Sequence, residues 1–319
     1  MPFRRHRPPR RCRDPRLLLA VLVAFTASVL LLVACAPSVS PNDTGAGTDP
    51  AAARREPQAI RSSPGCSLSR PAWPPEQVVV DGRERPVLAR VPTGGDGPPR
   101  DLVIVFHGRT NDAARVRRYV DLDRALPEAV IVYPRALPAR AGTFAWRNPG
   151  DPPGRLRDFA LVEAIVETFG GATCIDLERV FVVGHSLGAS FANDVACRLG
   201  QRIRAVASVA GGLQGRDCVG GAAAMILHHP DDRLVPFSVG ERVRDAFRAA
   251  NGLHATPAVP TRHPALAALR CVRFGEHDAE NPVTWCPHDD ATGPGGRHYP
   301  HTWPDGTAAA IRAFFATLP

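Results

Sequence analysis

The segment RVFVVGHSLGAS, residues 179–190, constrains the fold of this chain more than any other part of the sequence. An apolar run leads into a Gly-x-Ser-x-Gly pattern, and small residues follow it. This order predicts a buried strand, a tight turn that exposes the hydroxyl of Ser186, and a helix that starts at the turn. Glycine is needed at 184 and 188 because a side chain at either position would collide with the neighbouring strand or helix. The simpler alternative is a serine that only caps a helix.

Apolar segments of strand length alternate along the chain with segments of helical periodicity. Strands are expected at 101–106, 129–134, 179–184, 205–211 and 222–228, and helices at 156–170, 190–199, 239–250 and 307–318. Such alternation predicts an α/β fold with a mostly parallel central sheet and helices on both faces. An Asp-Gly pair within residues 78–92 predicts an antiparallel N-terminal hairpin that enters the sheet.

Two carboxylates follow the predicted strand 222–228. Active sites of parallel sheets form beyond the carboxyl ends of the strands, so this position suits a partner of Ser186. A serine hydroxyl is a weak nucleophile that needs a base, and the base needs an acid to orient it. One acid is enough for that task. We expect Asp232 to supply it and Asp231 to be a turn residue.

The base is expected near the end of the chain, before the closing helix. Residues 295–306 offer two histidines, His298 and His301. His301 precedes Thr-Trp-Pro in a stiff loop, where packing can hold the imidazole ring in place. We therefore expect His301 to be the base and His298 to be a surface histidine.

Backbone N–H groups must stabilise the negative charge that develops on a carbonyl oxygen during attack by serine. Leu187, which follows the nucleophile, is expected to supply one donor. The loop after strand 101–106 begins His107-Gly108-Arg109, and its glycine permits close approach of the backbone. The N–H of Arg109 is the expected second donor of this oxyanion hole.

The N-terminal 35 residues carry most of the net charge of the chain. Residues 1–16 hold seven arginines and one aspartate, a net +6 of the total +8. The apolar run 17–34 ends at Cys35, as in a lipoprotein signal peptide whose cysteine receives lipid; an uncleaved membrane anchor is the alternative. The composition of residues 36–64 predicts a flexible linker, and residues 65–319 are expected to form the folded domain. That near-neutral remainder provides no long-range field for nucleic acid.

Six cysteines follow the leader of this chain, which we expect to be exported. They are Cys66, Cys174, Cys197, Cys218, Cys271 and Cys286. An even set in an oxidising compartment predicts three disulfides, and the sequence alone does not choose their connectivity. No two of them have the C-x-x-C spacing of a zinc or redox site, so no metal site is expected.

Four motifs together resemble one group of secreted enzymes. They are Phe106-His-Gly, Ile175-Asp-Leu-Glu-Arg-Val-Phe-Val-Val-Gly-His-Ser-Leu-Gly, Asp232-x-x-Val-Pro-Phe and His301-Thr-Trp-Pro. From about Cys66 onward the chain resembles the esterases that group polyhydroxybutyrate depolymerases with feruloyl and acetylxylan esterases, the carbohydrate esterase family 1-like group. The resemblance implies the α/β-hydrolase fold and hydrolysis of carboxylic esters.

The resemblance also implies roles for particular residues. In that group His-x-Trp-Pro carries the catalytic histidine and Asp-x-x-Val-Pro the acid of the triad, which supports His301 and Asp232. It also implies two disulfides, Cys197–Cys218 and Cys271–Cys286. Two features depart from the pattern: Ser-Leu-Gly-Ala replaces Ser-x-Gly-Gly, and Arg109 stands where a small residue or Cys is frequent.

We therefore expect an exported serine esterase that acts on feruloyl or acetyl esters of plant polysaccharide, or on a short-chain polyhydroxyalkanoate. Two alternatives remain: a catalytically inactive α/β-hydrolase-like binding protein on the cell surface, and a serine peptidase on the same fold. No cofactor and no nucleic-acid partner are expected, membrane contact is limited to the N-terminal lipid or anchor, and the protein is expected to be a monomer. Substrate choice is expected to depend on loops 109–117, 140–156 and 275–300. Four aromatic residues are expected to pack in the core, with an aromatic platform near the cleft as the alternative: Phe144, Trp146, Phe237 and Trp285.

Overall fold

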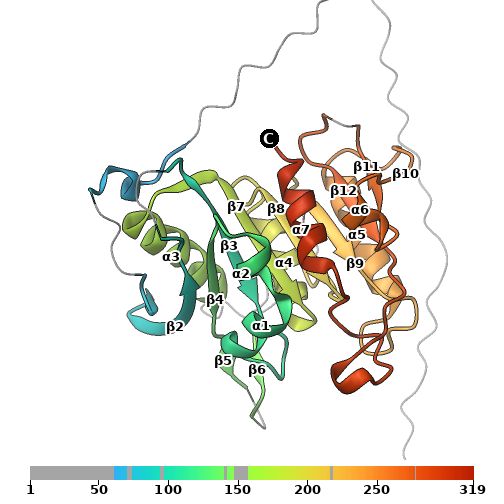
Figure 1. Ribbon diagram of the computed structural model, residues 1–319, viewed down its shortest axis with the longest axis horizontal. Helices are drawn as coiled ribbons and strands as arrows, with labels where there is room; N and C mark the ends of the chain where they lie inside the picture. Colours follow the sequence, from blue (N-terminus) through green and yellow to red (C-terminus); the bar gives the residue numbers. More distant parts are fainter. Residues whose placement is uncertain are drawn as a thin grey trace, which may run out of the picture. The chain divides into compact units, whose positions relative to one another are not determined.

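The computed structural model describes residues 61–69, 74–93, 97–139, 142–146, 157–215, 218–276 and 278–319 (Figure 1). The predicted leader and most of the predicted linker lie outside these residues. Within the described part, no helix is long and apolar enough to cross a membrane.

A ten-stranded sheet forms the centre of the folded domain (Figure 1). In spatial order its strands are β1 (Gln77–Val80), β2 (Arg83–Arg90), β4 (Val130–Pro134), β3 (Arg100–Phe106), β7 (Ile175–His185), β8 (Ala205–Val209), β9 (Ala223–Leu227), β12 (Val283–Cys286), β11 (Val272–Phe274) and β10 (Val259–Pro260). Neighbours from β4 to β12 pair in parallel, and the outer pairs at both edges are antiparallel. The structure thus confirms the mostly parallel sheet and its N-terminal hairpin. A separate small sheet consists of β5 (Leu137–Pro138) and β6 (Phe144–Ala145).

Helices cover both faces of the sheet. One face is covered by α3 (Arg157–Ala172), α4 (Leu187–Arg198) and α5 (Phe237–Ala250). The other carries α1 (Ala113–Val120), α2 (Leu122–Ala125), α6 (Pro264–Ala267) and α7 (Thr307–Ala316). Side chains of a strand point alternately to the two faces, so Ile104 packs in one core and Val105 in the other. Burial on both faces is the reason why the central strands read as continuous apolar runs.

The ends of the predicted elements differ from the observed ones by a few residues. The helix predicted from residue 190 begins at Leu187, directly after Ser186, and the strand predicted at 179–184 spans Ile175–His185. Several short elements were not predicted: α1, α2, α6 and the strands β10 to β12.

The folded domain begins earlier than residue 65. The backbone N–H of Ser63 donates to the carbonyl oxygen of Ile175 at 2.9 Å, and Leu177 N–H donates to Arg61 at 2.8 Å. The buried hydroxyl of Ser63 also bonds the backbone of Thr173 and Ile175, at 3.0 Å each. Residues 61–64, assigned above to the linker, are therefore held against the amino-terminal end of β7.

Three disulfides are present in the described domain. They are Cys66–Cys174, Cys197–Cys218 and Cys271–Cys286. The last two are the pairs that the family resemblance implied. The first ties the entry of the chain into the domain to the residue that precedes β7.

Candidate active site

Ser186 lies in a sharp turn between the carboxyl end of β7 and the first residue of α4. Its backbone has φ 57° and ψ −122°, which non-glycine residues rarely adopt. A Cβ on Gly184 would lie 2.3 Å from the carbonyl oxygen of Gly188, and a Cβ on Gly188 would lie 2.1 Å from that of Phe106. Both glycines are therefore required sterically, as the sequence predicted.

The structure brings Ser186, His301 and Asp232 together in one hydrogen-bonded row. The Nε2 of His301 lies 2.8 Å from Ser186 Oγ, and its Nδ1 lies 2.7 Å from Asp232 Oδ2. An ionised carboxylate only accepts hydrogen bonds, so Nδ1–H donates to Asp232 and Nε2 is free to accept the proton of the serine. The tautomer is thus the one that a base beside Ser186 requires.

Backbone donors hold Asp232 in position. Leu234 and Val235 donate their N–H groups to Oδ1 at 2.9 and 3.0 Å. Burial alone would raise the pKa of Asp232, but the hydrogen bonds from His301, Val235 and Leu234 lower it below its usual value overall. The carboxylate therefore stays charged opposite the imidazole.

The two alternative residues lie elsewhere. Asp231 is exposed in the turn after β9, where its backbone N–H donates to His229 Nδ1 at 2.9 Å. His298 is exposed and forms an isolated bridge with Thr292. Neither touches the hydrogen bonds that join Ser186, His301 and Asp232.

The loop after β3 is fixed beside the turn of Ser186. His107 is buried, its Nδ1–H donates to the oxygen of Gly108 at 2.8 Å, and its Nε2 accepts from Ala136 N–H at 3.1 Å. Burial lowers the pKa of His107, so the ring is neutral, as this pair of bonds requires. The Trp146 indole N–H donates to the His107 carbonyl oxygen at 2.8 Å.

The two expected oxyanion donors flank Ser186 in this arrangement. Leu187 is the first residue of α4, and the N–H groups of a first helical turn have no partner within their own helix. Arg109 is exposed, and its carbonyl oxygen accepts from Phe144 N–H at 2.8 Å, which ties the loop to β6. The Gly108 Cβ position lies 3.4 Å from Ser186 Cβ, so the loop passes close to the serine.

His185 and Tyr119 also belong to the site, although neither is among the site residues predicted from the sequence. Burial and the nearby His301 lower the pKa of His185 to about 3, so this ring is neutral. Its Nδ1 accepts from the Tyr119 hydroxyl at 3.0 Å, and its ring centre lies 5.5 Å from that of His301. The Gly-x-Ser-x-Gly motif places His185 next to Ser186, so this histidine could have been found from the sequence. Its partner Tyr119 on α1 could not be found without the fold.

A cleft of about 680 Å³ is lined by His185, which precedes Ser186, and by residues on both sides of His301 in the sequence. Tyr119, Tyr299 and Trp303 are among its lining residues. The lining comes from the two segments that follow β3 and precede α7. Parts of loops 109–117 and 275–300, expected to govern substrate choice, are therefore next to His301.

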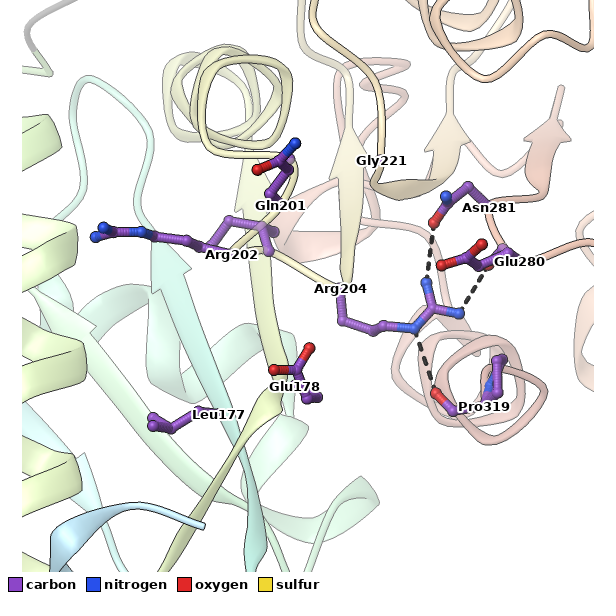
Figure 2. Close-up of a pocket in the computed structure, with 11 residues that line it drawn as sticks. Leu177, Glu178, Gln201, Arg202, Arg204, Gly221, Glu280, Asn281 and Pro319 are labelled. Carbon is purple, nitrogen blue, oxygen red and sulfur yellow. Dashed lines mark hydrogen bonds between the residues drawn. The ribbon is translucent and has the colours of Figure 1, made fainter. Parts of the chain in front are cut away.

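A second cavity, of about 240 Å³, lies near the amino-terminal ends of the central strands β8 and β9 (Figure 2). Arg204 occupies it and donates to Asn281 Oδ1 at 3.1 Å and to the carbonyl oxygens of Glu280 and Pro319 at 2.7 and 3.3 Å. Arg204 precedes β8 at its amino end, whereas Ser186 follows the carboxyl end of the parallel strand β7. Because these hydrogen bonds occupy the guanidinium of Arg204, we assign a structural role to this cavity.

The four aromatic residues expected in the core are packed there. Trp146 stacks on Phe191 with ring centres 5.3 Å apart, and Trp285 contacts Phe237 at 5.3 Å. Phe144 packs against His107 at 5.3 Å. Among the described residues, no group of three or more His, Cys, Asp or Glu side chains is placed to hold a metal ion.

Comparisons with known proteins agree with this architecture. No protein-family model matches the chain. It is 27% identical to feruloyl esterase C of Emericella nidulans over 239 residues, which cover 72% of this chain and 82% of the relative. It is 23% identical to feruloyl esterase D of Neurospora crassa over 245 residues, which cover 72% and 75% of the two chains.

Solved structures show the same fold. An acetyl xylan esterase from Aspergillus awamori matches with a TM-score of 0.51 and 12% identity over 73% of this chain and 94% of its own. A carboxylesterase from Bacillus cereus matches with a TM-score of 0.51 and 11% identity over 73% and 93%. The fold and the feruloyl esterase relatives together show that the chain is a carboxylic ester hydrolase with the α/β-hydrolase fold, related to the feruloyl esterases.

Proposed function

We propose that Ser186, His301 and Asp232 are the catalytic nucleophile, base and orienting acid of this esterase. The observation that supports this most is the continuous hydrogen bonding from Ser186 Oγ to Nε2, and from Nδ1 to the carboxylate, at 2.8 and 2.7 Å. A serine in a strained turn, aligned with a base that is itself oriented, is the arrangement that nucleophilic acyl transfer needs.

The first half of the reaction acylates the enzyme. Ser186 Oγ attacks the ester carbonyl carbon while its proton passes to His301 Nε2. Negative charge develops on the carbonyl oxygen, and the N–H groups of Leu187 and Arg109 stabilise it. The bond between the carbonyl carbon and the alkoxy oxygen then breaks, and Nε2 returns its proton to the leaving alcohol.

The second half releases the acid. Water gives a proton to His301 Nε2 and attacks the acyl carbon, which forms a second oxyanion in the same site. The bond to Ser186 Oγ breaks, the proton returns to the serine, and the free acid departs. Asp232 remains a carboxylate throughout and stabilises the imidazolium that forms twice in each cycle.

We propose further that the protein is exported and acts on feruloyl or acetyl esters of plant polysaccharide, or on a short-chain polyhydroxyalkanoate. Three disulfides and the leader sequence support export. The similarity to feruloyl esterases supports the polysaccharide esters. A panel of methyl ferulate, acetylated xylan and polyhydroxybutyrate tests the substrate class, and cell fractionation that finds the protein in the cytoplasm would contradict export.

The Ser186→Ala variant tests the nucleophile. We expect kcat/KM for p-nitrophenyl acetate to fall by at least about 10⁴-fold, because the variant has no activated hydroxyl that can attack the ester. The matched control is Ser238→Ala, at an exposed position on α5, which is expected to keep wild-type activity. Wild-type rates in Ser186→Ala would overturn the proposed mechanism.

A further inference from the structure

The cleft of about 680 Å³ lies next to the segment of the chain that carries His301. Tyr299, Thr302 and Trp303 surround that histidine in the sequence and all line the cleft. The ring of Tyr299 lies 6.0 Å from the His301 ring, and His185, which directly precedes the nucleophile, also lines the cleft. A group bound in this cleft is therefore next to the imidazole.

Aromatic rings form the walls of the cleft. The rings of Tyr119 and Trp303 lie 6.2 Å apart, and Trp303 lies 6.1 Å from His185. The Tyr119 hydroxyl is held by His185 Nδ1, and burial raises the pKa of Tyr119 beyond its usual range, so the wall stays uncharged. Amphipathic aromatic walls of this kind suit a ring that has both apolar faces and polar edges.

Two arginines also line the cleft. Arg115 lies one turn before Tyr119 on α1, so both side chains share a face of the helix, and Arg297 comes from the loop opposite. Both are exposed, and within the described part of the chain neither forms an ion pair. Among the described residues of the lining, Asp305 is the only acid, and His298, His185 and the two tyrosines are the other titratable groups besides the arginines.

We propose that this cleft binds the alcohol portion of the ester and favours an alcohol that carries a ring together with a carboxylate, as an acidic sugar does. The inference rests on the proposed function, because it takes His301 as the catalytic base and places the alcohol portion of the ester on the same side of the scissile bond as this histidine. The imidazole returns its proton to the leaving oxygen, so the leaving alcohol must lie on the His301 side. Guanidinium groups pair with carboxylates in preference to neutral polar groups.

Two matched aryl acetates test the proposal. 4-Acetoxybenzoate and 4-acetoxybenzamide release phenols of nearly the same shape, but only the first carries a negative charge. Their kcat/KM ratio, corrected for the rates of uncatalysed hydrolysis, is expected to favour the anion by about tenfold at low salt and to fall as NaCl is raised, since salt screens exposed charges. A ratio of one would overturn the proposal.

Variants that remove one positive charge each test whether the arginines of the cleft cause the preference for the anionic substrate. In Arg115→Gln and in Arg297→Gln the preference for the anion is expected to drop at least threefold, and in the double variant it is expected to vanish. Because each ratio compares two substrates on one preparation, partial unfolding does not change it. Arg118→Gln, on the same helix but outside the cleft, is the matched control and is expected to keep both the ratio and the basal activity.

A second pair of substrates tests the side of the ester. p-Nitrophenyl hydrogen glutarate and p-nitrophenyl pentanoate differ in charge only on the acyl portion, and the Arg115 and Arg297 variants are expected to leave their ratio unchanged. If the variants alter this ratio and not the first, the assignment to the alcohol side is wrong. Loss of the proposed function is distinguishable, because hydrolysis of p-nitrophenyl acetate would then not depend on Ser186.

Discussion

Gly188 leaves no room for a side chain at the point where α4 meets β3. Its Cβ position would lie 2.1 Å from the carbonyl oxygen of Phe106 and 2.7 Å from that of His107, and both obstacles are backbone atoms that cannot rotate away. Any side chain here must push the helix off the sheet. The N–H of Leu187 and the loop of Arg109 would separate as a result.

We expect Gly188→Ala to lose at least about 100-fold in kcat/KM and to lower the free energy of unfolding, because overpacking against backbone costs about 1–3 kcal/mol or more. Ester hydrolysis and urea unfolding measure the two effects. Gly171→Ala is the matched control: apart from the backbone of its own helix, no atom of the described residues lies within 4 Å of the Cβ position of this glycine. The change is therefore expected to stabilise the protein by up to about 1 kcal/mol. Equal behaviour of the two variants would contradict the steric argument.

Ser186 and Asp232 could be named from the sequence because each follows an apolar strand, and His301 because it precedes the closing helix, in the order that this fold requires. Ser186, Asp232 and His301 lie within hydrogen-bonding distance in the structure, as the strand-end rule predicted. Tyr119 could not be found in this way. Its position on α1 depends on how that helix packs against His185, which is a contact between residues 66 positions apart.

The helix α4 carries a buried carboxylate, Asp194, that takes no part in the hydrogen bonds of Ser186. Asp194 is 1% exposed; its Oδ1 accepts from the N–H groups of Gln214 and Gly215, at 2.9 and 3.0 Å. Its Oδ2 has no hydrogen-bond partner among the described residues. Burial raises the pKa of Asp194 to about 6 despite the two backbone bonds. The native state therefore holds this proton more tightly than the unfolded chain, so stability decreases as pH rises from about 4 to 6 and stays lower above it.

Asp194→Asn removes this cost and keeps an oxygen for the two backbone donors. We expect the variant to be more stable than the wild type at pH 8, by about 1–3 kcal/mol, with the difference shrinking towards pH 4. Urea unfolding at both pH values measures it. Asp245→Asn is the control, because that exposed carboxylate pairs with Arg244 and its removal is expected to give no gain. A variant less stable than wild type at pH 8 would contradict the assignment.

Long apolar elements were predictable and short ones were not. Strand β12 has four residues between Pro282 and Pro287, which are too few to show a repeating pattern of apolar residues. It is nevertheless buried and pairs in parallel with β9. Helix α1 has only eight residues, of which three are arginines, so its apolar face is narrow. Both elements are specified by the sheet on which they pack, and that information is absent from their own residues.

Histidine burial affects the whole domain. His107, His185, His228 and His288 are all buried, and burial lowers the pKa of each, to about 3 for His185 and about 4 for His288. An unfolded histidine titrates near 6.5, so the unfolded chain binds protons that the native protein refuses as pH falls below that value. The free energy of unfolding of the domain must therefore decrease as pH falls below about 6.5.

We expect the free energy of unfolding to fall by at least about 1.4 kcal/mol for each pH unit between 6 and 5, which corresponds to a net uptake of one or more protons on unfolding. Asp194 opposes this trend, so urea unfolding of the Asp194→Asn variant should show a steeper decrease than the wild type. A stability that is constant or rises towards pH 5 in that variant would refute the role of the buried histidines.

The place where the chain enters the domain lies far from the proposed nucleophile. Ser63 and the Cys66–Cys174 disulfide fix that entry to the start of β7, whereas Ser186 follows the end of the same strand, about 35 Å away for eleven extended residues. An attachment through the residues before Arg61 would therefore act on the amino-terminal end of β7, remote from Ser186. Fusion or immobilisation through those residues would leave the surroundings of Ser186 unobstructed.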